Sequence, residues 1–360
     1  MSVLNIALIG PGLVGREFLR QIAQHQKRSS GIQLRVVALA TSKRVVVAGS
    51  SEASVDETQW RDSSDPVSEL VSAASAASGE SVVVDCTASD AVARQYPNWL
   101  AKGLHVVTPN KKPFASDLAL FDAIKSASKS GRPVVLHEAT VGAGLPILST
   151  LSDIVETGDE IVKIEGILSG TLSYIFNNYS TTDAGAIRKF SDIVNEAKER
   201  GYTEPDPRDD LNGMDVGRKV TILGRVAGIR LSLDTLSIEN IVPEPLRAIE
   251  TAEEFMRKLP EFDAHFAALN AAAAAKGKVL RCVGVVDPAE GASGVRLAEY
   301  DASHPFAALK GSDNIIAFTT RRFPNPLIVQ GAGAGAEVTA FGIFSDVLKI
   351  AKRVGYASSA

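Results

Sequence analysis

The segment from Gly201 to Lys219 gathers side chains that can bind a small polar molecule and transfer a proton. It opens with GYTEPDPRDD, which combines several carboxylates with two prolines. Because proline restricts the backbone, this segment can hold its side chains in fixed positions. We expect a helix to follow over residues 211–228, with Asp209 or Asp210 as its N-cap.

Asp215 and Lys219 stand four residues apart on the expected helix and therefore share one face. This spacing alone is also typical of an exposed ion pair, which contributes about 0.5 kcal/mol. The same helix contains three glycines, Gly213, Gly217 and Gly224. Each glycine costs about 1 kcal/mol relative to alanine. Small residues kept at that cost indicate close approach by another backbone or a ligand, which favours a functional site.

The reduction of a carbonyl group suits this set of residues. Hydride must reach the carbon, and a positioned acid must give a proton to the oxygen. A lysine such as Lys219 can be that acid where burial or a neighbouring cation makes its proton easier to release. Acid catalysis of this kind contributes about 10²–10⁴-fold. Lys111 and Lys112 could provide the neighbouring cation, or they could form an ordinary basic loop.

A glycine-rich hexapeptide, GPGLVG at residues 10–15, lies between an apolar run and a helical pattern. This is the context in which G-x-G-x-x-G binds a dinucleotide. The first glycine permits a tight turn, the second lets the backbone approach a pyrophosphate, and the third allows close helix packing. A plain structural turn is the alternative. The expected cofactor contacts are Gly10, Gly12, Leu13, Val14 and Gly15.

The end of the next expected strand selects between two forms of the cofactor. An NAD site usually carries an acid there, which binds the ribose hydroxyl. This chain has Thr41, Ser42, Lys43 and Arg44 instead. Two cations suit a 2′-phosphate, so we predict NADP(H) in preference to NAD(H). A solvated basic turn is the alternative.

A further loop follows the expected strand at residues 81–85. Ligands of open α/β sheets bind beyond the carboxyl ends of the strands. We therefore expect Thr87 and Ala88, with Ser89 in the same loop, to flank the cofactor. Cys86 precedes them, and we interpret it as a packed thiol, with a catalytic nucleophile as the alternative.

Two kinds of secondary-structure pattern must position these residues. Up to about residue 150, apolar strands alternate with helices, which predicts a parallel sheet covered on both faces. Beyond that point, alternating strands and long helices predict an α+β domain with a mixed or antiparallel sheet. Residues 42–80 fit neither pattern cleanly, and we expect a long loop and one helix there.

The expected elements are as follows. Strands are predicted at residues 3–9, 34–40, 81–85, 105–107, 133–137, 161–167, 278–286, 295–299, 314–320 and 327–330. Helices are predicted at residues 13–28, 91–102, 118–128, 184–200, 211–228, 252–258, 264–276 and 337–354. The last helix is expected to return to the first domain.

Composition excludes several classes of protein. The 360 residues carry a formal net charge of −4 and no long basic run, which argues against nucleic acid as a partner. No apolar stretch is long enough for a membrane span. The N-terminus shows no signal or transit pattern. Two cysteines, Cys86 and Cys282, form no disulfide framework, so we expect a reducing, cytoplasmic setting.

Two glycine-containing segments also draw attention. Residues 138–146, EATVGAGLP, follow an expected strand near the domain boundary, and their carbonyls could line a cation site or form a hinge. Residues 331–335, GAGAG, could approach the cofactor or let the chain return to the first domain.

Together these motifs resemble homoserine dehydrogenase, specifically its short fungal type without a regulatory domain. The resemblance covers nearly the whole chain, and the segments at 137–146 and 201–219 are highly specific. The matching segments are residues 10–15, 108–112, 137–146, 164–166, 169–176, 201–215 with Lys219, 304–306, 310–314 and 331–335.

The resemblance implies an architecture and an activity. It implies an NADP-binding Rossmann domain at residues 1–150, completed by 331–360, and a substrate-binding, catalytic and dimerisation domain at 151–330. It also implies a homodimer. The implied reaction is the reversible reduction of L-aspartate 4-semialdehyde to L-homoserine, in the route to threonine and methionine.

The resemblance also implies roles for individual residues. Lys219 corresponds to the proton donor, and Lys111 to a lysine that faces substrate and cofactor. The substrate or catalytic-water ligands would be Glu204 and Asp215, with Asp210, Tyr202 and Thr171 nearby. Gly201 and Gly335 correspond to cofactor contacts. A sodium site made mostly of backbone carbonyls would comprise Glu138, Val141, Ala143 and Leu145.

Two departures and two alternatives complete the interpretation. The chain stops at Ala360, so we expect no regulatory domain and no inhibition through one. Residues 42–80 match no part of the family pattern, which leaves the ribose-phosphate contacts open. The alternatives are a semialdehyde dehydrogenase that acylates a cysteine, and a nonenzymatic NADP-binding module.

Overall fold

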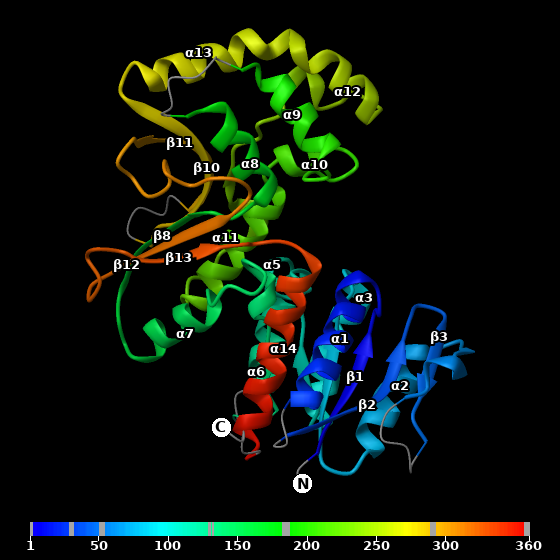
Figure 1. Cartoon of the computed structure of the whole chain (residues 1–360). Coiled ribbons are helices and arrows are strands. Elements are labelled where there is room, and N and C mark those ends of the chain that lie inside the picture. The colour runs from blue at the N-terminus through cyan, green and yellow to red at the C-terminus, as the bar shows by residue number, and fades with distance from the viewer. Residues whose placement is uncertain are drawn as a thin grey trace. The chain divides into compact units, whose positions relative to one another are not determined.

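The computed structural model describes residues 3–28, 32–49, 55–128, 131, 133–181, 188–288 and 293–355. The chain divides into two compact units. Unit 1 comprises Met1–Gly144 and Gly335–Ala360, and unit 2 comprises Leu145–Ala334. Each unit is built around its own sheet, which confirms the predicted fold class (Figure 1).

A mainly parallel sheet organises unit 1. Its strands are β1 (Val3–Ile9), β2 (Gln33–Ala40), β3 (Arg44–Val47), β4 (Arg61–Asp62), β5 (Glu80–Asp85), β6 (His105–Val107) and β7 (Val135–Leu136). In the described part of the unit their order is β4-β3-β2-β1-β5-β6-β7. β2, β1, β5, β6 and β7 are parallel, and β3 and β4 extend one edge antiparallel. The strand order reverses beside β1, where open α/β sheets bind their ligands.

Helices of unit 1 pack against this sheet. They are α1 (Leu13–Arg28), α2 (Pro66–Ala76), α3 (Asp90–Ala93), α4 (Tyr96–Ala101), α5 (Lys112–Ala115), α6 (Leu118–Ala127) and α14 (Ala336–Arg353), with 3-10 turns η1 (Glu57–Gln59) and η2 (Glu138–Thr140). The continuous helix predicted at 91–102 was wrong, because α3 ends before α4 begins. Pro97 explains the break, since proline lacks an N–H and is tolerated in the first turn of a helix.

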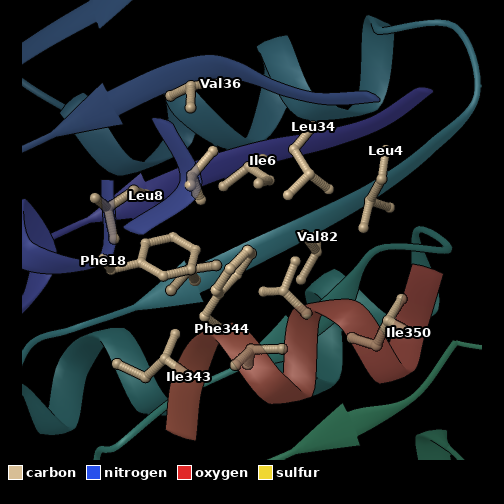
Figure 2. Packing of buried hydrophobic residues seen from close by; sticks show 14 of the residues in the cluster. Leu4, Ile6, Leu8, Phe18, Leu34, Val36, Val82, Ile343, Phe344 and Ile350 are labelled. Carbon is tan, nitrogen blue, oxygen red and sulfur yellow. The ribbon is translucent and has the colours of Figure 1, made fainter. Parts of the chain in front are cut away.

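The core of unit 1 lies between β1 and the helices α1 and α14 (Figure 2). The rings of Phe18 and Phe344 meet edge to face, with centroids 6.2 Å apart. Each fully buried side chain of this size contributes about 1.5–3 kcal/mol. The labelled members of the core in Figure 2 are Leu4, Ile6, Leu8, Phe18, Leu34, Val36, Val82, Ile343, Phe344 and Ile350. The last helix of the chain thus packs into the core of the first unit.

Residues 42–80 contain more regular structure than the predicted loop and helix. The helix is α2. The expected loop also contains β3, which pairs with β2, and β4, which pairs with β3. Val45 and Val46 are buried there. Strands of two to four residues are too short to show a periodic pattern, so only their pairing with β2 defines them.

A mixed sheet organises unit 2, as predicted. Its strands are β8 (Ile161–Ile167), β9 (Ser237–Ile238), β10 (Lys278–Val286), β11 (Gly294–Asp301), β12 (Asn314–Thr320) and β13 (Leu327–Gly331). Their order in the described part is β13-β12-β8-β10-β11-β9. The pairs are antiparallel, except that β9 lies parallel to β11.

The helices of unit 2 carry four of the predicted site residues, Thr171, Asp210, Asp215 and Lys219. They are α7 (Leu148–Glu156), α8 (Gly170–Tyr179), α9 (Phe190–Glu199), α10 (Arg208–Leu211), α11 (Met214–Val226), α12 (Ala252–Lys258) and α13 (Asp263–Ala274), with 3-10 turns η3 (Leu233–Thr235), η4 (Glu244–Leu246) and η5 (Leu259–Phe262). Of the helix predicted at 184–200, residues 184–187 lie outside the described residues, and the described part becomes helical only from Phe190, as α9. The helix predicted at 211–228 is divided, because Gly213 between α10 and α11 has a φ of 75°.

Candidate active site

The glycine loop after β1 has the geometry that the sequence predicts for each glycine. Gly10 has a φ of 80°, a left-handed conformation that favours glycine. A Cβ on Gly15 would lie 2.6 Å from the carbonyl oxygen of Gly10, so α1 could not pack as closely with any other residue. A Cβ on Gly12 would meet nothing within 4 Å, and Leu13 is 80% exposed. The loop therefore leaves open space at the N-terminus of α1, which fits a pyrophosphate.

The turn between β2 and β3 presents two cations. The Thr41 hydroxyl accepts hydrogen bonds from the backbone N–H groups of Lys43 and Arg44, at 3.3 and 3.0 Å. The Arg44 guanidinium lies 5.6 Å from the ring centroid of Trp60. Both basic residues are exposed, and the hydroxyl of Thr41 fixes the backbone that carries them.

A buried polar cluster supports the loops after β5 and β6. The Asp85 carboxylate accepts hydrogen bonds from the backbone N–H of Thr87 at 2.8 Å and from the Tyr96 hydroxyl at 2.5 Å. The Asn110 amide also donates to Asp85, at 3.3 Å. Burial raises the pKa of Asp85 against these hydrogen bonds. The cluster holds the predicted cofactor loop beside half-buried Lys111, the residue after Asn110.

Sequence reasoning missed the role of Asp85 in this cluster. The signal was an acidic residue at the buried end of a strand, where an unpaired charge would be costly. Cys86 follows it, and burial raises the pKa of its thiol above the usual range. Such a thiol is a poor nucleophile, because the thiolate is the reactive form.

The segment at 138–144 is held by α14. The backbone N–H of Glu138 donates to the Asp346 carboxylate at 2.9 Å, and the Glu138 carboxylate lies 3.2 Å from the Lys349 ammonium. Ala143 has a φ of 54°, which is unusual for a residue with a side chain. A Cβ on Gly342 would lie 2.6 Å from the Ala143 carbonyl oxygen. The predicted cation-site residues Glu138, Val141 and Ala143 thus belong to a buried, fixed backbone.

Two backbone carbonyls of residues 138–145 accept local hydrogen bonds. The Glu138 carbonyl accepts the N–H of Val141 at 3.3 Å, and the Leu145 carbonyl accepts the N–H of Ile147 at 2.8 Å. Each carbonyl oxygen has two lone pairs. No cluster of three metal-ligating side chains occurs among the described residues. A cation held by this segment would therefore have backbone carbonyl oxygens as its ligands.

Lys219 of α11 is buried beside a half-exposed carboxylate. Its ammonium lies 2.8 Å from the Asp215 carboxylate and donates to the Leu168 carbonyl at 2.6 Å. The Lys219 side chain is 9% exposed, whereas that of Asp215 is 44% exposed. The two residues do form the ion pair that their spacing allows, but its lysine end lies in the interior.

A second cluster joins α8 to residues 202–210. The Thr171 hydroxyl contacts the Tyr202 carbonyl at 2.6 Å and the Asp210 carboxylate at 2.8 Å. The other Asp210 oxygen accepts the backbone N–H of Glu204 at 2.8 Å. Burial raises the pKa of Asp210, and the charges of Glu204 and Asp215 raise it further. Leu168 and Thr171 are three residues apart, so the two clusters meet at the start of α8.

The outer residues of this cluster face solvent. Glu204 is exposed, and the Tyr202 ring is stacked on Tyr174 with centroids 4.6 Å apart. Gly201 has a φ of 71° and ends the turn after α9. Gly335, the other predicted cofactor contact in this family pattern, has a φ of 115° and lies at the N-terminus of α14 in unit 1.

Two expectations about α11 were wrong. Neither Asp209 nor Asp210 caps it, because the N-cap is Gly213, and the Asp210 carboxylate is used by Thr171 and Glu204. The helix glycines do not accommodate a ligand. A Cβ on Gly217 would lie 2.5 Å from Ile238, and one on Gly224 would collide with Leu231. These glycines allow close packing of apolar side chains.

A cavity of about 660 Å³ lies in unit 1 between α2 and the helices α3 and α4. None of the predicted site residues lines it. Among the described residues, no helix combines the length and apolar character needed to cross a bilayer.

Two family models together cover most of the chain. The model for homoserine dehydrogenase matches residues 146–348, and the model for the homoserine dehydrogenase NAD-binding domain matches residues 10–138. The chain belongs to the homoserine dehydrogenase family. Members of this family are NAD(P)-dependent oxidoreductases, so the predicted family and enzyme class are confirmed.

The chain is similar in sequence both to relatives of about its own length and to much longer relatives. The homoserine dehydrogenase of Saccharomyces cerevisiae is 45% identical, and the match covers 98% of this chain and 99% of that protein. The bifunctional aspartokinase/homoserine dehydrogenase 1 of Arabidopsis thaliana is 47% identical over 98% of this chain. The chain spans only 39% of the length of that plant relative.

A solved structure agrees with this assignment of family. A Candida auris protein of unknown function is 46% identical and superposes with a TM-score of 0.92. The superposition covers 98% of this chain and 99% of that one. The fold described above is therefore shared by an experimental structure over nearly the whole chain.

Proposed function

We propose that this chain is an NADP-preferring homoserine dehydrogenase, which reversibly reduces L-aspartate 4-semialdehyde to L-homoserine in the route to threonine and methionine. The observation that carries the proposal is the buried ammonium of Lys219 beside Asp215. A buried lysine held by one carboxylate and one carbonyl is suited to deliver a proton to a substrate oxygen. We assign NADP binding to residues 1–150 with 331–360, and substrate binding and dimerisation to 151–330.

Lys219 is the proton donor in this proposal. Its ammonium has three hydrogens, and two are directed at described partners, Asp215 and the Leu168 carbonyl. The third is available for the carbonyl oxygen of the aldehyde. Asp215 keeps the ammonium in place while the proton leaves, and Lys111 faces substrate and cofactor. The cofactor supplies the hydride when bound.

Carboxylates around α8 bind the polar end of the substrate. The exposed carboxylate of Glu204 pairs with the substrate ammonium, and Asp210 holds the backbone of Glu204 through its N–H. Thr171 and Tyr202 complete the binding surface. The Thr171 hydroxyl donates to the Tyr202 backbone carbonyl at 2.6 Å. The substrate is thereby oriented with its aldehyde towards Lys219, an arrangement that lowers the barrier through positioning.

The cofactor is held by the chain's own backbone and by two cations. The turn at Gly10, Gly12 and Gly15, with Leu13 and Val14, accepts the pyrophosphate. Lys43 and Arg44 bind the 2′-phosphate, because both are exposed on a turn that lacks an acid at the end of β2. The remaining proposed contacts are Thr87, Ala88, Lys111, Gly201 and Gly335.

Sodium and a second copy of the chain complete the proposed enzyme. Sodium would be bound mainly by backbone carbonyls of Glu138, Val141, Ala143 and Leu145. The partner would be a second identical chain, joined through the sheet of unit 2. The two free thiols, Cys86 and Cys282, suit the reducing cytoplasm.

The direct test is oxidation of NADPH in the presence of L-aspartate 4-semialdehyde, with and without sodium. We expect stoichiometric L-homoserine, and a higher kcat/KM with NADPH than with NADH. NADPH binding without turnover would favour a nonenzymatic NADP-binding module. Acyl transfer to Cys86 would favour a cysteine-dependent semialdehyde dehydrogenase.

A further inference from the structure

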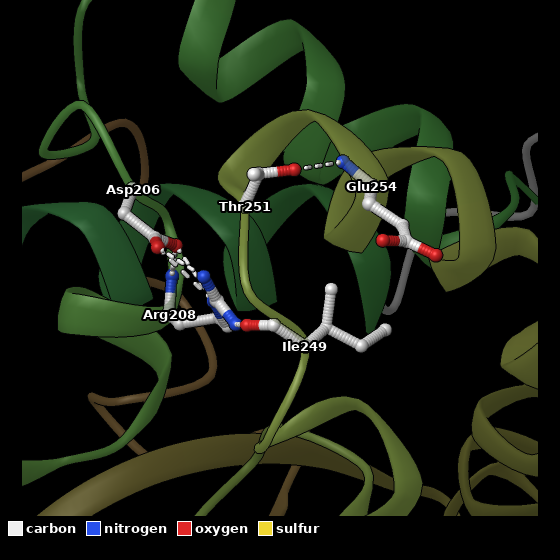
Figure 3. A network of polar contacts seen from close by, with 5 residues as sticks. All are labelled: Asp206, Arg208, Ile249, Thr251 and Glu254. Atoms are coloured by element: carbon white, nitrogen blue, oxygen red, sulfur yellow. Dashed lines mark hydrogen bonds and ion pairs between the residues drawn. The ribbon is translucent and has the colours of Figure 1, made fainter.

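Arg208 makes contacts that none of the proposed catalytic steps uses. Its guanidinium forks onto the Asp206 carboxylate, with Nε at 3.0 and 3.1 Å and Nη2 at 2.6 Å from the carboxylate oxygens (Figure 3). The Arg208 backbone N–H donates to the same carboxylate at 3.0 Å. The Arg208 side chain is only 15% exposed. A bidentate pair of this kind is geometrically specific, and it fixes the turn that begins α10.

The other side of the guanidinium reaches a distant segment. Nη1 of Arg208 donates to the backbone carbonyl of Ile249, 41 residues further along the chain (Figure 3). The guanidinium also lies 5.5 Å from the ring centroid of Phe255, which is fully buried in α12. Thr251 caps this helix by accepting the N–H of Glu254 at 3.2 Å. Arg208 thus joins residues 206–210 to a capped helix.

Substrate-binding groups lie on the same short turn as Arg208. Asp210 is two residues further on, and its carboxylate holds the Glu204 backbone and contacts Thr171. The backbone N–H of Asp210 donates to Pro207 at 3.2 Å, and that of Asp209 donates to Asp206 at 3.0 Å. A shift of Arg208 would therefore move Asp210 and, through it, Glu204.

We infer that Arg208 is a positioning residue for the substrate, which clamps the substrate loop (residues 201–210) to residues 249–255. The inference rests on the proposed function, which assigns substrate binding to Glu204 and Asp210. Arg208 touches neither substrate nor cofactor in this scheme. It acts through Asp206 on one side and through Ile249 and Phe255 on the other.

The inference predicts a separation of KM from kcat. In Arg208→Met, the fork and the bond to Ile249 are lost while an unbranched side chain that can cover the same apolar surface is kept. We expect KM for L-aspartate 4-semialdehyde to rise about tenfold, because misplaced binding groups weaken substrate binding. We expect kcat to change by less than about threefold, since Lys219 and Asp215 are unaffected. The Kd for NADPH should stay at the wild-type value.

A conservative variant and a matched control define the role further. In Arg208→Lys, one ammonium cannot reproduce the planar fork, so we expect KM between those of the wild type and Arg208→Met. Arg257→Met removes an exposed arginine from α12, the helix that also carries Phe255, and should leave KM unchanged. If Arg208→Met does not fold, Asp206→Asn weakens the same fork and should raise KM in the same direction.

The outcomes separate this inference from the proposed function. A lower melting temperature with an unchanged KM in the Arg208 and Asp206 variants would show that the clamp is only structural and would overturn the inference. A wild-type protein that does not reduce the semialdehyde would instead overturn the proposed function. A raised KM with kcat and NADPH binding retained supports both.

Discussion

The hydroxyl of Thr171 lies 2.8 Å from the carboxylate of Asp210, and the same hydroxyl lies 2.6 Å from the Tyr202 carbonyl. A hydroxyl carries one hydrogen, and a carbonyl and an ionised carboxylate are both acceptors. The single hydroxyl hydrogen of Thr171 is therefore shared between two acceptors. Burial raises the pKa of Asp210.

Thr171→Val should weaken substrate binding and stability together. The valine keeps the shape of the side chain but leaves the Tyr202 carbonyl and Asp210 without their shared partner. An unsatisfied buried polar group costs about 1–3 kcal/mol, which urea unfolding would measure. We also expect a higher KM for the semialdehyde. Thr171→Ser keeps the hydroxyl and should recover most of both effects, whereas equal values for Val and Ser would refute the role of the hydroxyl.

Alanine substitutions of two glycines of the cofactor loop should have different consequences, one for stability and the other for cofactor binding. A Cβ on Gly15 would lie 2.6 Å from the Gly10 carbonyl oxygen, so Gly15→Ala should lower the melting temperature. A Cβ on Gly12 meets no described atom within 4 Å, so Gly12→Ala should fold normally. Its methyl group would occupy space needed by the pyrophosphate, and we expect the Kd for NADPH to rise about tenfold or more.

Thermal unfolding and cofactor titration of the two variants give the comparison. A Gly12→Ala protein with wild-type affinity for NADPH would contradict the proposed position of the pyrophosphate.

Removal of the cations after β2 should affect one cofactor only. In Lys43→Ala with Arg44→Ala, the 2′-phosphate loses two charge-assisted contacts, each worth about 1.5–3 kcal/mol. We expect KM for NADPH to rise and KM for NADH to stay constant, and the loss should shrink at high salt. Steady-state kinetics with both cofactors measures this. A parallel change for NADH would show that the turn does not recognise the 2′-phosphate.

Cys86 should be dispensable and unreactive. Burial raises the pKa of its thiol above the usual range, and burial raises that of Cys282 to about 12. The thiolate fraction at pH 8 is therefore negligible, so neither cysteine of the folded protein should react quickly with iodoacetamide. Cys86→Ser should keep kcat near the wild-type value. A large loss of kcat in that variant would support the cysteine-dependent alternative.

Patterns of apolar residues were sufficient to predict the main strands. The runs at 3–9 and 161–167 coincide with β1 and β8, because a buried strand needs consecutive or alternating apolar residues. β3 and β4 were not predicted, since they are short and depend on pairing at the edge of β2. α8 was also missed as a helix, because its residues are buried nearly all round and show no amphipathic period.

The candidate site was only partly accessible to sequence reasoning. Four-residue spacing placed Asp215 and Lys219 on one face, but it could not show that Lys219 is buried against the Leu168 carbonyl. That contact joins residues 51 positions apart, and it forms only when α11 packs against the rest of unit 2. The glycines of α11 were misinterpreted for the same reason, because Ile238 and Leu231 approach them from later segments.

The proton donor is the central claim, and one paired measurement tests it. Lys219→Met keeps an unbranched side chain, one atom shorter, but cannot protonate the substrate, and Lys276→Met removes an exposed, ion-paired lysine of unit 2 as a control. We predict that kcat for the semialdehyde falls about 10²–10⁴-fold in Lys219→Met and is unchanged in the control. NADPH binding should be retained in both proteins. A Lys219→Met protein that binds NADPH and turns over at the wild-type rate would contradict the account.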